Sequence, residues 1–229
     1  MEFVVASTFT PSGMTLSGKY ETGVISIGGM ASQGLKSLAR QWEFAEESAL
    51  KHGTAIDRKN WRILMSWHIA ESRDQAREEA KDGLLIHNNE YTTRALRPDD
   101  GQIFKTADEA VDAVAFSGVG NAVIGTPDDL INKIQEMIDV TGGFGAVIGF
   151  AHDWANRENT KKSWDLVARY VIPEINSMLA DYRDSIEFVV NNRETWKRAT
   201  DARLSNVAEH ESAAKVMQTE GLEGEKSKS

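Results

Sequence analysis

Short apolar runs that alternate with helix-like segments constrain the fold of this chain more than any other feature. Runs of this length, rich in β-branched residues, are typical of strands buried on both faces. The segments between them carry apolar residues at spacings of three and four, as amphipathic helices do. This alternation predicts parallel β/α units. The expected strands are residues 3–6, 23–27, 61–69 and 144–151.

Residues that favour capping mark the ends of two expected helices. Ser72 precedes a helix predicted over residues 73–86, and Thr126 with Pro127 opens another that ends at residues 141–143. Threonine suits the N-cap because its side chain accepts a hydrogen bond from a free amide, and proline suits the first turn. Further helices are expected over residues 14–20, 35–53, 107–116 and 157–172.

The count of strands predicts an incomplete α/β barrel, because a closed (β/α)₈ barrel needs eight strands and four are visible. We expect a partial barrel over residues 1–172, with an insertion at about 88–125. A helical arm is expected over residues 173–218, followed by a disordered tail over residues 219–229, where apolar side chains are scarce.

Charge and composition exclude several classes of function. The net charge of −9 argues against a surface that binds nucleic acid, since phosphate binding needs clustered Lys and Arg. The absence of cysteine excludes disulfides and thiolate chemistry. No apolar run has the length of a membrane span, and the N-terminus lacks the basic start of a secretory signal. The cytoplasm is the expected location.

The turn after the first expected strand is rich in hydroxyl groups. Ser7, Thr8 and Ser12 lie there, and Gly13 allows close approach of the backbone. Hydroxyls beside a helix N-terminus are typical of an anion site, because the first amides of a helix have no partner within it. From local sequence alone an ordinary capping turn is the favoured alternative, and both interpretations stay open.

His152 and Trp154 follow the last expected strand, where β/α proteins gather their functional groups. Histidine at this place suits substrate binding or proton transfer. The alternative is a purely structural turn in which Asp153 or Asn156 caps the next helix. His68, inside the third strand, is interpreted as a hydrogen-bonded core residue. The other histidines are expected at the surface, and none has metal-ligand spacing: His52, His87 and His210.

Several stretches together resemble one family, in their order and spacing over about residues 2–190. They are VASTFTPSGM at residues 5–14, GVISI at 23–27, HIAESRDQA at 68–76, GTPDD at 125–129, GGFG at 142–145, AHDWA at 151–155 and ARYVIP at 168–173. The chain resembles the C-terminal half of a bacterial luciferase-like flavin-dependent monooxygenase, of the limonene- and alkanal-monooxygenase-like branch.

The resemblance implies a (β/α)₈ barrel that uses reduced FMN and O₂ on an apolar organic substrate, with the flavin reduced by a separate reductase. It assigns the FMN phosphate to Ser7 and Thr8, with Ser12 and Gly13 in support. His152 and Trp154 become weaker candidates for the substrate pocket, and the catalytic residues stay unknown. They belong to β/α units that precede the first strand of this chain.

A half barrel leaves sheet edges and apolar surface uncovered, so self-association is expected. Two further hypotheses differ in class from an enzyme. One is a non-catalytic partner subunit, or an inactive fragment, that keeps the fold. The other is a helical interaction protein in which residues 173–218 are the functional part.

Overall fold

The computed structural model describes residues 2–8, 10–27, 32–116 and 122–209. The chain divides into two compact units, Met1–Asn176 and Ser177–Ser229, and each is described by itself. Three predicted features lie outside the described residues. These are the glycines that close the second expected strand, the glycine-rich stretch at 117–120 and the end of the chain from residue 210.

The first unit is built on one parallel sheet in which β3 is central. Every strand pair is parallel, as the β/α alternation predicts. One edge of β3 pairs first with β2 and then with β4, while β5 pairs with the opposite edge from Arg62 to Ser66. The strands are β1 (Val4–Ser7), β2 (Gly23–Ser26), β3 (Trp61–Ile69), β4 (Ala122–Gly125) and β5 (Ala146–Phe150).

Four of these strands match the prediction, and β4 does not. The sequence predicts that residues 122–125 end an insertion, but they extend the sheet for four residues beside the second half of β3. Its identity as a strand depends on pairing with a distant part of the chain, which a local sequence pattern does not reveal. The α/β class and the half-barrel architecture are confirmed.

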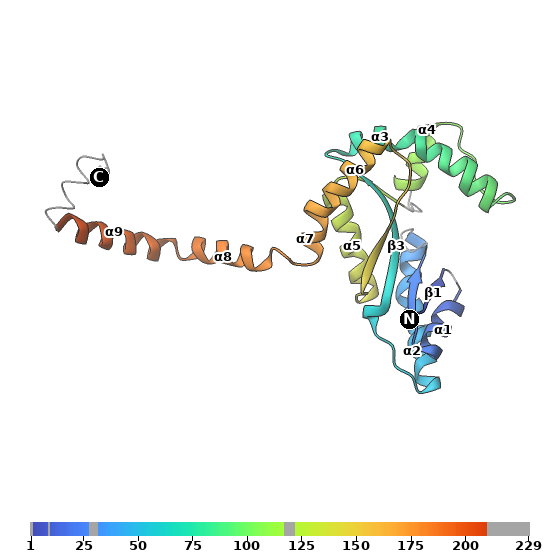
Figure 1. Ribbon diagram of the computed structural model, residues 1–229, viewed down its shortest axis with the longest axis horizontal. Coiled ribbons are helices and arrows are strands. Elements are labelled where there is room, and N and C mark those ends of the chain that lie inside the picture. The colour runs from blue at the N-terminus through green and yellow to red at the C-terminus, as the bar shows by residue number, and fades with distance from the viewer. Residues whose placement is uncertain (1, 9, 28–31, 117–121, 210–229) are drawn as a thin grey trace. The chain divides into compact units, whose positions relative to one another are not determined.

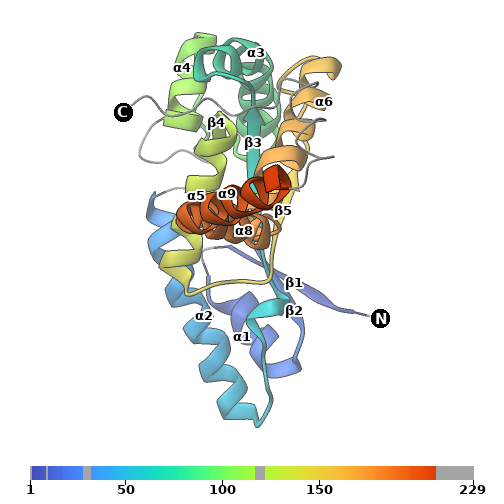
Figure 2. The ribbon, with the colours of Figure 1, turned by 90° about the vertical axis from the view of Figure 1, so that its left-hand side faces the viewer.

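The helix-facing side of the sheet carries the main core. Side chains two residues apart along a strand lie on one face, so Trp61, Ile63 and Met65 of β3 are buried together. They pack against α1, α2, α5 and η4, which lie along the strands (Figure 2). Trp61 also stacks on Trp42 of α2, with ring centroids 5.0 Å apart.

The helices of the first unit begin and end largely where the capping residues predicted. Ser72 accepts from the Gln75 amide, and Thr126 forms a capping box with Asp129. Gly142 ends α5 at φ 73°, a conformation that glycine adopts without strain. The helices are α1 (Ser12–Tyr20), α2 (Ser32–His52), α3 (Arg73–Ile86), α4 (Ala107–Val111), α5 (Pro127–Thr141), α6 (Arg157–Leu166) and α7 (Ile172–Ile175).

Irregular helical turns join several of these elements. A 3₁₀ turn, η1 (Arg58–Asn60), precedes β3. The π-helical segments η2 (His87–Leu96), η3 (Asp112–Phe116) and η4 (Val167–Val171) continue α3, α4 and α6. A second cluster of buried residues joins α3 and α4 to β4 and to Trp154. The segment between β3 and β4 therefore covers the carboxyl end of the sheet (Figure 1).

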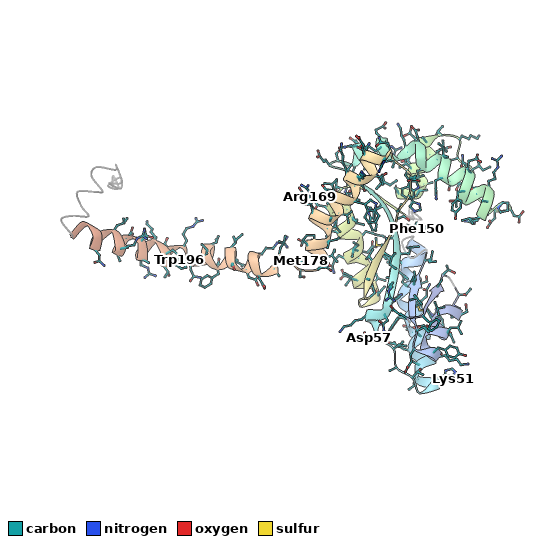
Figure 3. All side chains as sticks on the ribbon, in the orientation of Figure 1. Lys51, Asp57, Phe150, Arg169, Met178 and Trp196 are labelled. Atoms are coloured by element: carbon teal, nitrogen blue, oxygen red, sulfur yellow. The ribbon has the colours of Figure 1, made fainter. Side chains whose placement is uncertain are left out.

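The second unit contains two helices, α8 (Ala180–Asn191) and α9 (Arg193–Glu209), among its described residues. Ser177 precedes them with a positive φ of 53°, which marks the turn out of the first unit. Apolar side chains of these helices are exposed, among them Phe188 and Trp196, the latter labelled in Figure 3. Among the described residues, no helix has the length and apolar character needed to cross a membrane.

Candidate functional site

A cavity of about 170 Å³ lies at the carboxyl ends of β3 and β5. Its walls come from Ser66 of β3, His87 of η2, and His152 and Trp154 after β5, with further residues of α3, η2 and η3. Figure 3 labels Phe150, the last residue of β5, close to this end of the sheet, and Asp57 at the opposite end. The cavity therefore occupies the place where parallel β/α folds carry their functional groups.

Three aromatic rings form a stack along the segment that ends β5. The imidazole of His152 lies between the rings of Phe150 and Trp154, at centroid distances of 4.7 and 4.2 Å and interplanar angles of 10° and 4°. An extended backbone places every second side chain on one side, which brings these three into line. The stack fixes the orientation of the His152 ring.

His152 is hydrogen-bonded to Ser66 and has a neutral ring. Its Nε2 lies 2.9 Å from Oγ of Ser66. Burial, with a smaller contribution from His87, lowers the pKa of His152 to about 4, while Asp153 opposes the shift. The imidazole is therefore uncharged at neutral pH, and each ring nitrogen either donates or accepts a hydrogen bond.

The position of His87 corrects the expectation that it lies at the surface. Its ring meets that of His152 edge-on, with centroids 4.9 Å apart and an interplanar angle of 72°. Burial lowers the pKa of His87 as well. No sequence pattern indicates this contact, because His87 follows the last residue of α3 and its place depends on how α3 folds back over the sheet.

The turn after β1 brings two of its predicted site residues into contact. A Cβ added to Gly13 would lie 2.9 Å from Cβ of Ser7 and 2.6 Å from the Ala6 carbonyl oxygen. Only glycine lets α1 approach the strand so closely. Ser7 is buried beneath α1, and among the described residues its Oγ has no hydrogen-bond partner.

The other hydroxyl groups of this turn are exposed. Thr8 and Ser12 lie at the surface, and Oγ of Ser12 is 2.8 Å from Oγ1 of Thr10. Pro11 stands at the N-cap of α1 and offers no side-chain acceptor to the first amides of the helix. The turn thus combines surface hydroxyls with an uncapped helix N-terminus. None of its residues lines the His152 cavity.

A series of hydrogen bonds holds this turn against the sheet, and the sequence did not reveal it. Nε1 of Trp61 donates to Oγ of Ser26 at 2.9 Å, and that hydroxyl donates to Oε1 of Gln41 at 3.4 Å. The amide nitrogen of Gln41 donates in turn to the carbonyl oxygen of Thr8. Gln41 is a buried residue of α2, and its position on the helix face gave no sign of this role.

His68 is a buried core residue, as expected. Its Nε2 lies 2.9 Å from Oε2 of Glu79 on α3, and both side chains are largely buried. The pair ties α3 to β3. No group of metal-ligating side chains occurs within the part of the chain that the structure describes.

Comparisons with known proteins agree with the resemblance in the sequence. The chain is 33% identical to 4-hydroxyprotoasukamycin monooxygenase of Streptomyces nodosus subsp. asukaensis, over 87% of this chain and 53% of that protein. It is 29% identical to limonene 1,2-monooxygenase of Rhodococcus erythropolis, over 94% and 54%. The chain is similar to one half of a luciferase-like monooxygenase. No protein-family model matches it.

A solved luciferase-like structure shows the same fold. It is the oxygenating constituent of 3,6-diketocamphane monooxygenase of Pseudomonas putida, in complex with FMN. It superposes with a TM-score of 0.56 at 22% identity, over 75% of this chain and 48% of that one. The chain thus spans about half the length of its luciferase-like relatives.

Proposed function

We propose that this chain is the C-terminal, FMN-binding half of a luciferase-like monooxygenase, which uses reduced FMN and O₂ to oxygenate an apolar organic substrate. The observation that supports the proposal most is the cavity at the carboxyl ends of β3 and β5, with neutral His152 held between two aromatic rings. Reduced FMN supplies the electrons for activating O₂. The chain contributes binding, orientation and exclusion of water.

The turn after β1 has the groups that a phosphate needs. Thr8 and Ser12 have exposed hydroxyls, and the backbone amides at the start of α1 face no capping side chain. These groups fit the FMN phosphate, since donors at a helix N-terminus favour an anion. Gly13 holds α1 against the strand, and Ser7 carries the unpartnered hydroxyl beneath it. We assign the phosphate site to these four residues.

His152 and Trp154 are the proposed wall of the substrate pocket. A neutral imidazole adds less polarity to the pocket than an imidazolium, and its Ser66 partner keeps the ring nitrogen hydrogen-bonded. Such a wall suits an apolar molecule with one polar group. We further propose that a separate reductase supplies the reduced FMN and that the protein acts in the cytoplasm.

A second candidate function is a non-catalytic partner subunit or an inactive fragment that keeps the fold. The observation that favours it is the length of the chain, which spans about half of each relative. The helices pack on one face of the sheet, whereas Val4 and Phe150 on the other face are exposed, so the described residues do not supply all the walls of a complete pocket.

An FMN titration separates the two candidates. FMN fluorescence is followed as the 229-residue chain is added. A parallel titration uses a longer form of the chain that includes the residues encoded upstream of Met1. For the monooxygenase half we expect saturable quenching in the extended form and weaker quenching in the shorter one. Absence of quenching in both forms contradicts the proposed FMN site and favours the partner subunit.

A further inference from the structure

We propose that Gln41 of α2 is a positioning residue for the phosphate of a flavin nucleotide, and that it sets the preference of the chain for FMN over riboflavin. The inference rests on the proposed function, because it takes the turn after β1 as the phosphate site. Gln41 does not touch the phosphate in this proposal. It acts through the backbone of Thr8, to which it is hydrogen-bonded.

Gln41 is a polar residue on the buried, otherwise apolar face of α2. It is 5% exposed, and Leu38, Trp42 and Ala45 of the same helix are buried beside it. A buried amide group costs free energy unless its donor and its acceptor both have partners. Leucine at this position would avoid that cost. A buried amide with both partners instead fixes one arrangement of the chain around it.

Both ends of the Gln41 amide have partners, and their order follows from hydrogen-bond chemistry. The indole of Trp61 can only donate, so Oγ of Ser26 accepts from it at 2.9 Å and donates in turn to Oε1 of Gln41 at 3.4 Å. The NH₂ group of Gln41 is thereby directed to the carbonyl oxygen of Thr8, which can only accept. Ser26 ends β2 and Trp61 begins β3, so the sheet fixes the direction of the donor that holds the turn.

The bond to Thr8 matters for an anion because a carbonyl oxygen carries partial negative charge. A phosphate is repelled by a carbonyl oxygen that points toward it, and is attracted by hydroxyl and amide donors. Gln41 holds the Thr8 carbonyl oxygen toward α2, while the Thr8 side chain stays exposed to a ligand. Without the Gln41 amide this carbonyl has lost its donor and is free to turn toward the phosphate. We therefore expect the loss to weaken the phosphate contact and to leave contacts with the flavin ring in place.

A second hydrogen bond from α2 has the same form but reaches α1 instead of the turn. Oγ of Ser48 donates to the carbonyl oxygen of Thr15 at 2.8 Å. Ser48 is a buried polar residue of α2, as Gln41 is, and each bond joins residues 33 positions apart. Thr15 lies inside α1, where the helix's own hydrogen bonds already fix the backbone. Loss of the Ser48 hydroxyl thus removes a comparable bond without loosening the turn.

The test compares the dissociation constants of FMN and riboflavin for the unmodified chain and for Gln41→Met, with Ser48→Ala as the matched control. The two flavins differ only in the phosphate, so the ratio of their dissociation constants isolates the phosphate contact. Each titration follows flavin fluorescence, in the 229-residue chain and in the form extended upstream of Met1. Methionine is unbranched and flexible, so it fills the space of glutamine without supplying an amide.

We expect the unmodified chain to bind FMN more tightly than riboflavin. Gln41→Met should reduce this preference by about tenfold, a change of the size that one hydrogen bond produces, and should change the affinity for riboflavin little. Ser48→Ala is expected to lower the free energy of unfolding and to keep the preference for FMN. A merely structural role of Gln41 would instead weaken the binding of both flavins by the same factor.

The outcomes separate this inference from the proposed function. If the unmodified chain in both forms binds FMN no more tightly than riboflavin, the phosphate site assigned to the turn is wrong and the inference fails with it. If the unmodified chain prefers FMN and Gln41→Met keeps that preference, only the role of Gln41 is overturned. The same holds if Ser48→Ala reduces the preference as much as Gln41→Met does.

Hydrogen exchange of side-chain amides avoids dependence on the folding of any variant. In the unmodified chain the Nε2 group of Gln41 is bonded to Thr8, whereas Gln135 is an exposed glutamine on α5. We expect the Nε2 protons of Gln41 to exchange more slowly than those of Gln135, and their NMR signals to shift more with FMN than with riboflavin. Equal exchange rates for the two glutamines, or equal shifts with the two flavins, would overturn the proposal.

Discussion

The imidazole of His152 lies between Phe150 and Trp154, with His87 edge-on and Ser66 as its polar partner. Placing this histidine at the end of a strand was enough to predict that it lies at the functional end of the fold. Its lowered pKa, by contrast, comes chiefly from burial, with a smaller contribution from His87, and both depend on tertiary packing. The sequence therefore predicted that His152 lies at this end of the sheet but not its charge.

The free energy of unfolding is expected to fall as the pH is lowered from about 6.5 to 4, because the pKa of His152 in the folded chain is lowered to about 4 from its ordinary value of 6.5. The unfolded chain takes up a proton first over this range, so acid favours unfolding. The lowered pKa of His87 acts in the same direction. Urea unfolding at pH 7.5, 6 and 5 measures the effect.

The matched control for this experiment is His52, an exposed histidine at the end of α2. His152→Gln is expected to flatten the pH dependence, whereas His52→Gln retains it. The lowered pKa of Asp129, about 2, affects stability only below pH 4 and does not interfere. If the free energy of unfolding changes equally with pH in the two variants, His152 is not the titrating group.

Thr8→Ala is expected to weaken FMN binding by about 1.5–3 kcal/mol in a complete barrel, the range for a hydrogen bond to a charged group. Thr8 is exposed, and its carbonyl is already held by Gln41, so loss of the hydroxyl leaves the backbone of the turn in place. Isothermal titration with FMN measures the change. Ser185→Ala, a hydroxyl loss in α8, serves as the control, and equal affinities in the two variants argue against the site.

At the level of elements, caps were the most dependable signal. The helix starts at Ser72 and Thr126 and the end at Gly142 all appear where the sequence placed them. These features are local, because each depends on side chains within four residues of a helix end. β4 was missed because its existence depends on pairing with β3, more than fifty residues earlier in the chain.

Thr126→Ala is expected to destabilise the first unit by about 1–2 kcal/mol, the usual cost of losing an N-cap. Two bonds are lost together, since Thr126 accepts from the Asp129 amide and donates to its carboxylate. The free energy of urea unfolding measures this loss. Gln135→Ala, on the exposed face of the same helix, is the control and should change stability by no more than about 0.5 kcal/mol. Similar losses of unfolding free energy in Thr126→Ala and Gln135→Ala would exclude a special role for the cap.

For the whole molecule, the proposed function predicts that the isolated 229-residue chain does not oxygenate a substrate. About half of each relative has no counterpart in it, so the described residues supply only part of a complete pocket. Product analysis with FMN, a flavin reductase, O₂ and terpene or long-chain aldehyde substrates tests this. The upstream-extended chain is the positive control. Substrate-dependent product from the short chain alone contradicts the prediction.

The uncovered face of the sheet has a consequence for the behaviour of the chain at different abundances. Whatever covers this face binds the folded form and not the unfolded one, so it shifts the folding equilibrium by mass action. If a separate partner supplies this cover, the melting temperature rises with the concentration of that partner; if the same polypeptide supplies it, the melting temperature does not depend on concentration. A cell that makes little of that partner would hold this chain closer to unfolding, and would degrade more of it, than a cell that makes much.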